Sequence, residues 1–188
     1  MVQPADRAAW RGWLEANHTT STGVWLAYFR KGRGPRIDYP EGVEEALCFG
    51  WIDSVAGKLD EDRTLLWYSP RRPASGWARP NKERVVRLIG EGLMTPAGLA
   101  AIDEAKRRGT WTLLDDVEDL IVPDDLDQAF DAAPPARANW NAFSRSVRKG
   151  ILTWIVQAKR PETRAKRVGE TARRAAVDEK AYPPARKD

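Results

Sequence analysis

Cysteine and histidine each occur only once in this chain of 188 residues, as Cys48 and His18. A single cysteine cannot form an internal disulfide, and these two residues are too few ligands for a Cys/His zinc site. No segment reaches the roughly 18 consecutive apolar residues that a membrane-spanning helix needs. The N-terminal sequence MVQPADRAAW also lacks the basic and apolar regions of a secretory signal peptide. We therefore expect a cytoplasmic protein without a metal, a cofactor or a membrane span.

Motifs that would identify an enzyme are also missing from the sequence. The chain has neither a Walker lysine motif nor GxGxxG, so nucleotide-binding folds that depend on them have no support. No catalytic triad and no pair of carboxylates stands out either. The sequence thus favours a binding protein over an enzyme.

Charge is unevenly distributed along the chain, although the net charge is only +4 at pH 7. The segment from Asp115 to Asp131 contains many carboxylates and no Lys or Arg, whereas residues 159–187 are dominated by Arg and Lys. Adjacent segments of opposite charge can pair with each other, and we favour this interpretation. The alternative is a basic face that is reserved for a polyanion.

Apolar periodicity and turn residues predict an α+β fold, in which a small antiparallel sheet is packed by helices and followed by a C-terminal helical region. We expect residues 1–114 to form the α+β domain, in the order α-β-α-β-β-α-α. Residues 51–69 should form an antiparallel hairpin in which Trp51, Asp53 and Val55 share one face. Asn81 should cap the helix that follows the hairpin.

Residues 115–188 should form an acidic connector and the C-terminal helical region. Apolar residues recur at helical spacing from residue 123 onward, most clearly at Ile151, Trp154 and Ile155. We expect helices over residues 123–132, 136–144, 147–158 and 161–176, and a frayed tail over residues 182–188.

Several segments resemble one bacterial family, the YdeI/OmpD-associated or bacteriocin-protection proteins. They are NHTTSTGVWLAYFRK, YPEGVEEALCFGWIDS, SPRRPASGWARPNKERV, GLMTPAGLAAIDEAKRRGTW and TWIVQAKRPETRAKRV, which together extend over most of the chain. The chain departs from the family pattern at Ser54, where Gly is typical. The family name implies a link to outer-membrane porins or bacteriocin tolerance, and the resemblance implies no catalytic residue.

Two reactive side chains have ordinary structural explanations. Cys48 lies between Leu47 and Phe49, near the C-terminal end of a predicted helix, where the helix dipole disfavours a thiolate. We expect it to pack in the core and not to act as a nucleophile. His18 follows the first predicted helix, where capping or loop packing explains it.

Asp53 is the most informative single residue, because a carboxylate on the same strand face as Trp51 needs a partner. Arg71 and Arg72 follow the returning strand, and guanidinium groups pair well with carboxylates. The same groups could form a buried ion pair that ties the hairpin to the next loop, or they could line a ligand pocket.

The loop after the hairpin has the composition of an anion site. It combines two guanidinium groups with aromatic side chains and precedes a helix, whose N-terminus offers backbone N–H groups and a positive dipole. Solvated arginines beside core tryptophans are the competing interpretation. The candidate ligand-binding residues are Trp51, Asp53, Trp67, Arg71, Arg72, Ser75, Trp77, Asn81 and Lys82.

The basic C-terminal helix is a second candidate site, for nucleic acid, because a row of cations can follow a phosphate backbone. The residues concerned are Lys159, Arg160, Arg164, Lys166 and Arg167. We favour a solvated helix that forms salt bridges with the acidic connector.

These observations predict a protein that binds a small anionic or aromatic ligand, as a monomer or a homodimer, with a role in stress or bacteriocin tolerance implied by the family name. A nucleic-acid-associated stress protein is the first alternative. An enzyme of unknown reaction is the second.

Overall fold

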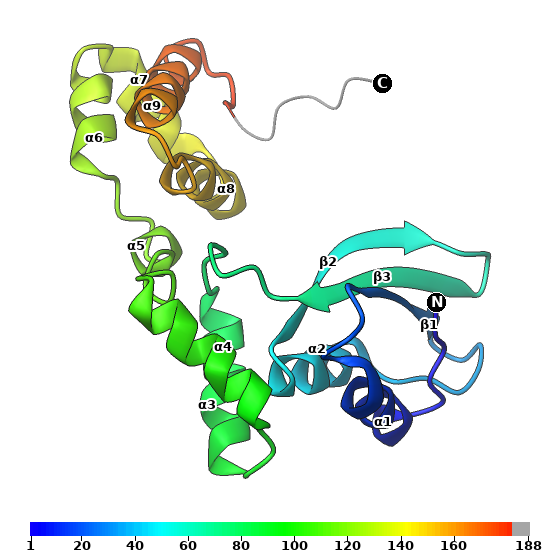
Figure 1. Ribbon diagram of the computed structural model, residues 1–188. Helices are drawn as coiled ribbons and strands as arrows, with labels where there is room; N and C mark the ends of the chain where they lie inside the picture. The colour runs from blue at the N-terminus through cyan, green and yellow to red at the C-terminus, as the bar shows by residue number, and fades with distance from the viewer. Residues whose placement is uncertain (182–188) are drawn as a thin grey trace. The chain divides into compact units, whose positions relative to one another are not determined.

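The computed structural model describes residues 1–181, so the predicted tail over residues 182–188 lies outside the described part of the chain. Within it the protein has nine helices and one three-stranded antiparallel sheet, which confirms the predicted α+β class (Figure 1). The chain divides into two compact units, Met1–Thr112 and Leu113–Asp188. Over the described residues, no helix combines the length and apolar character needed to cross a membrane.

The first unit follows the predicted order of elements, although the boundaries shift by a few residues. Thr95 caps the last helix with its side-chain oxygen, and Gly50 ends the second helix in a left-handed conformation with a φ of 74°. The elements are α1 (Arg7–Asn17), β1 (Val24–Phe29), α2 (Tyr39–Cys48), β2 (Trp51–Lys58), β3 (Arg63–Pro70), α3 (Arg79–Gly90) and α4 (Pro96–Arg107).

The strands lie in the order β1-β3-β2, so β3 is the central strand and pairs antiparallel with both neighbours. Strand β2 contains a bulge, because Asp53 pairs with Tyr68 whereas Ala56 pairs with Leu66. The extra residue shifts the alternation of side chains. Trp51 is only 1% exposed and Val55 is 57% exposed. The prediction that these two share a face is therefore wrong beyond the bulge.

Helix α3 begins earlier than predicted. Ala78 is the residue before its first turn, and Pro80 occupies a position in that turn where the missing N–H is harmless. Asn81 lies inside the helix, where its side-chain oxygen accepts a hydrogen bond from Arg84 at 2.9 Å. The predicted capping role of Asn81 is therefore wrong.

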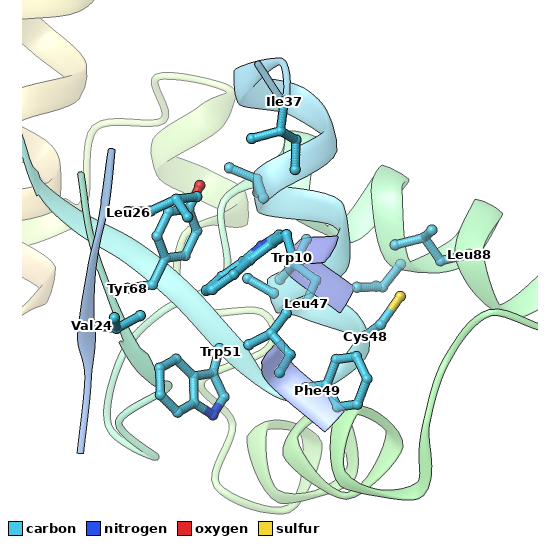
Figure 2. Packing of buried hydrophobic residues seen from close by; sticks show 14 of the residues in the cluster. Trp10, Val24, Leu26, Ile37, Leu47, Cys48, Phe49, Trp51, Tyr68 and Leu88 are labelled. Carbon is cyan, nitrogen blue, oxygen red and sulfur yellow. The ribbon is translucent and has the colours of Figure 1, made fainter. Parts of the chain in front are cut away.

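The core of the first unit is centred on Trp10 of α1, which lies fully buried between α2 and the sheet (Figure 2). Its indole Nε1 donates to the carbonyl oxygen of Gly42 at 3.0 Å, and its ring contacts that of Tyr68. The hydroxyls of Tyr28 and Tyr68 are hydrogen-bonded to each other at 2.7 Å. Burial raises the pKa of both phenols, so both stay protonated at neutral pH.

Glu45 is a buried carboxylate that ties α2 to α1. It is 2% exposed and accepts hydrogen bonds from Arg7 at 2.5 Å and from Arg11 at 2.8 Å. Two guanidinium groups therefore compensate the cost of burying its charge.

In the described residues of the second unit, helices joined by loops are the regular structure and strands are absent, as predicted, and an apolar core surrounds Phe130, Trp140 and Ile151. The predicted acidic connector contains a short helix, and its Val117 and Glu118 are buried. The elements are α5 (Asp115–Glu118), α6 (Asp124–Asp131), α7 (Pro134–Ala142), α8 (Arg145–Val156) and α9 (Pro161–Ala175).

The close approach of α2 to the sheet predicts that Gly42→Ala destabilises the protein. A Cβ atom at residue 42 would lie 2.1 Å from the hydroxyl oxygen of Tyr28 and 3.0 Å from that of Tyr68. We expect a loss of about 1–3 kcal/mol in the free energy of unfolding, measured by denaturant titration.

Gly12→Ala is the matched control, because nothing lies within 4 Å of a Cβ atom at that helical position. We expect it to stabilise the protein by about 0.5–1 kcal/mol through helix propensity. Equal effects of the two substitutions would contradict the packing that we describe at Gly42.

Candidate functional site

An open pocket of about 580 Å³ lies beside the hairpin, between strands β2 and β3 and the loop that leads to α3. Asp53 and Ser54 line it from β2, and Trp67 and Ser69 line it from β3. The other polar lining residues come from the loop and the first turn of α3. Six of the nine candidate ligand-binding residues line it, namely Asp53, Trp67, Arg71, Arg72, Ser75 and Asn81.

Arg71 is the central charge of this pocket. Its Nη2 donates to the carbonyl oxygen of Gly76 at 3.0 Å, and its guanidinium carbon lies 3.9 Å from the centre of the Trp77 ring. Trp77 is 2% exposed and supports the guanidinium of Arg71 from beneath. Burial lowers the pKa of Arg71 to about 10, against the opposing charge of Asp53. The group is therefore still charged at neutral pH.

Asp53 does not pair with an arginine. Its Oδ2 accepts a hydrogen bond from the hydroxyl of Tyr39 at 3.1 Å, and within residues 1–181 no ion pair joins it to Arg71 or Arg72. The predicted Asp53–arginine pair is therefore wrong. The guanidinium of Arg71 is held instead by Trp77 and Gly76, and the partner of Asp53 comes from the start of α2.

Tyr39 could not be found by sequence reasoning. It precedes Asp53 by 14 residues and lies at the first position of a helix, where nothing in the local pattern indicates a contact with a strand. Only the packing of α2 against the sheet brings its hydroxyl to the carboxylate.

Arg72 is exposed, and among the described residues its side chain has no hydrogen bond or ion pair. The loop around it is held by a turn, because the amide of Ser75 donates to the carbonyl oxygen of Arg72 at 2.9 Å. Trp67 lies against Gly23, where a Cβ atom would come within 2.3 Å of its ring, and contacts Trp25 edge-on at 5.3 Å. The aromatic wall of the pocket is thus held by its neighbours.

The N-terminus of α3 contributes less than the sequence predicted. Pro80 has no N–H, and the amides of Asn81 and Lys82 already donate to the carbonyl oxygen of Ala78. The positive character of the pocket therefore comes mainly from the two guanidinium groups.

Three candidate residues lie outside this pocket. Trp51 is a core residue whose indole donates to the carbonyl oxygen of His18 at 3.2 Å. Trp77 lies beneath Arg71 and lines a smaller neighbouring cavity of about 90 Å³. The ammonium of Lys82 lies 5.2 Å from the centre of the Trp111 ring.

The basic helix of the second unit is partly neutralised. Arg164 binds both carboxylate oxygens of Asp125, at 2.7 and 2.9 Å, so the acidic and basic segments do pair. Arg167 donates to the carbonyl oxygen of Trp154 and lies 5.0 Å from the centre of its ring. The other three nucleic-acid candidates are exposed, namely Lys159, Arg160 and Lys166.

Comparison with known families assigns most of the chain. Residues 2–101, more than half of the 188, match the model of a domain of unknown function, DUF8412. The chain belongs to this DUF8412 family. Residues 119–177 match the model described as bacteriocin-protection, YdeI or OmpD-associated, which confirms the resemblance for the C-terminal part of the chain. No curated protein and no solved structure matched.

The sequence predicted a resemblance to the YdeI/OmpD-associated family over most of the chain, but that family's model matches only residues 119–177. The segment TWIVQAKRPETRAKRV lies within the YdeI/OmpD-associated match. The first three segments, with the pocket residues Asp53, Arg71 and Arg72, fall within the DUF8412 match, and the fourth begins inside it and runs past residue 101. The pocket is therefore a feature of the DUF8412 part of the chain.

Cys48 is fully buried in this DUF8412 part, as predicted. Burial raises the pKa of its thiol to about 11, against the partly opposing charge of Arg11. His18 points its Nδ1 at the carbonyl oxygen of Leu14, 2.9 Å away, and packs against Phe49. Both side chains thus have structural roles.

We expect Cys48 to react slowly with a thiol reagent in the native protein. A pKa of about 11 leaves about one thiol in a thousand ionised at pH 8, and the buried sulfur is inaccessible as well. Labelling at pH 8 should be at least roughly a hundredfold slower in buffer than in denaturant. His18→Ala should not change the labelling rate of the native protein. Rapid labelling of the native protein that is lost in His18→Ala would instead support a nucleophilic role for Cys48.

Proposed function

We propose that the first unit binds a small anionic ligand in the pocket beside Arg71. The proposal rests on the burial of the Arg71 side chain and on its lack of an ionic partner among the described residues. Arg71 is largely buried on Trp77 with one backbone carbonyl as its hydrogen-bond partner, and within the described chain it has no ion pair with a carboxylate. Buried charges are normally paired, so an anion from solution would supply the missing partner.

The surroundings of Arg71 support an anion of modest size. Arg72 offers a second guanidinium without a partner in residues 1–181, and Ser75 and Asn81 add polar groups to the pocket lining. Trp67 provides a flat apolar surface for a ring or a carbon chain. The volume of about 580 Å³ is within the range of about 300–1,000 Å³ that small-molecule pockets occupy.

The nucleic-acid alternative has less support, because Arg164 and Arg167 already have partners within their own unit. A cytoplasmic location and a role in stress or bacteriocin tolerance remain parts of our proposal. They rest on the sequence and on the family name.

Arg72→Ala tests the proposal directly. We would screen phosphate, sulfate, citrate and nucleoside monophosphates for a rise in melting temperature, and then measure affinity by calorimetry. Because Arg72 is exposed, with no side-chain partner among the described residues, the substitution should leave the melting temperature of the free protein within about 1 °C. It should weaken binding of the best anion roughly tenfold or more.

Arg30→Ala is the matched control, because Arg30 is also exposed and does not line this pocket. It should leave anion affinity unchanged. The proposal fails if no anion raises the melting temperature, or if Arg72→Ala and Arg30→Ala have the same effect on binding.

A further inference from the structure

Two opposite charges line the same pocket without pairing with each other. Arg71 and Asp53 attract each other at a distance, yet neither is the other's hydrogen-bond or ion-pair partner within residues 1–181. Tight pairing is the usual arrangement when a carboxylate and a guanidinium share a partly buried site. Their separation leaves both poles available to a ligand.

Asp53 has unused capacity as an acceptor. A carboxylate has about four lone-pair sites, and within the described chain Asp53 accepts a single hydrogen bond, from the neutral hydroxyl of Tyr39. That bond orients the carboxylate without neutralising it. The carboxylate of Asp53 is therefore held in position and can still accept hydrogen bonds from a ligand.

The charges of the pocket define a complementary ligand. Arg71 and Arg72 are positive and Asp53 is negative, so the matching molecule has two negative charges at one end and one positive charge at the other. We infer that the ligand class is an amine-bearing dianion, such as a phosphomonoester or dicarboxylate with an ammonium group. The anionic group would bind the guanidinium groups and the ammonium would bind Asp53.

Asp53 would also reject other anions. An anion that filled the pocket without a cationic group would place its far end beside an uncompensated carboxylate, which costs free energy. The same residue therefore selects for the ammonium group and against plain polyanions. This inference rests on the proposed function, because it concerns the same pocket.

A pair of matched probes tests it in the full-length protein. O-Phosphoethanolamine carries a phosphate and an ammonium group, whereas ethyl phosphate has the phosphate alone and ethanolamine has the ammonium alone. By calorimetry at pH 7.5, we expect the unsubstituted protein to bind O-phosphoethanolamine roughly tenfold more tightly than ethyl phosphate. Ethanolamine alone should bind more weakly than either phosphate.

Asp53→Asn should remove this preference. Asparagine keeps the shape and an acceptor for Tyr39 but loses the charge, so the affinity for ethyl phosphate should stay the same or rise. Asp103→Asn makes the same change at an exposed position that does not line the pocket, and it should keep the preference. The melting temperature of each variant checks that it is folded.

The outcomes separate the two ideas. Equal affinity of the unsubstituted protein for both phosphates, or an equal loss of both in Asp53→Asn, overturns the ammonium site and leaves the anion site standing. Failure of every anion in the earlier screen removes the proposed function and this inference with it. The comparison of the two phosphates in the unsubstituted protein decides the matter even if a variant does not fold.

Discussion

The contact between helix α2 and the sheet at Gly42 is the constraint on which the first unit depends. The missing side chain lets the hydroxyls of Tyr28 and Tyr68 fill the space against the helix, while the backbone carbonyl accepts the indole proton of Trp10. One residue thus connects α1, α2, β1 and β3. Because the polar groups there satisfy one another, three large aromatic side chains can be buried without unpaired hydroxyl or N–H groups.

The geometry of the pocket follows from that contact. Tyr39 lies one helical turn before Gly42, so the packing of α2 determines where its hydroxyl meets Asp53. On the other side, the amide of Arg71 donates to the carbonyl oxygen of Gly50 at 2.9 Å, which ties the end of the hairpin to the end of α2. The negative and positive poles are therefore positioned by the two ends of the same helix. A site built on such supports can hold a charge that has no partner of its own.

In the second unit, many of the charged side chains form ion pairs with one another. Its carboxylates at Asp125, Asp127 and Asp131 are paired with Arg164 or Arg137, and Lys149 binds Glu118. Uneven charge along a chain therefore gives no binding surface by itself, because folding brings the opposite segments together. In the first unit, Asp53, Arg71 and Arg72 line one pocket without an ion pair among the described residues, and this makes the pocket the stronger candidate.

Local sequence determined the elements of this protein. Helical periodicity, the cap at Thr95 with Pro96, and the left-handed Gly50 are signals confined to a few neighbouring residues, and each predicted element is present. The hairpin and the burial of Cys48 were predictable for the same reason, since alternation and apolar neighbours depend on short separations in the chain.

The tertiary structure decided the contacts that distant residues make. The bulge between Asp53 and Ala56, the start of α3 at Arg79 and the place of β3 between its two neighbours depend on how whole elements pack. So does the choice of Tyr39 over an arginine as the partner of Asp53. Sequence reasoning placed six candidate residues at the pocket because they lie within one hairpin, its following loop and the first turn of the next helix. It could not assign their partners, because hydrogen bonds and ion pairs form between atoms that only the fold brings within reach.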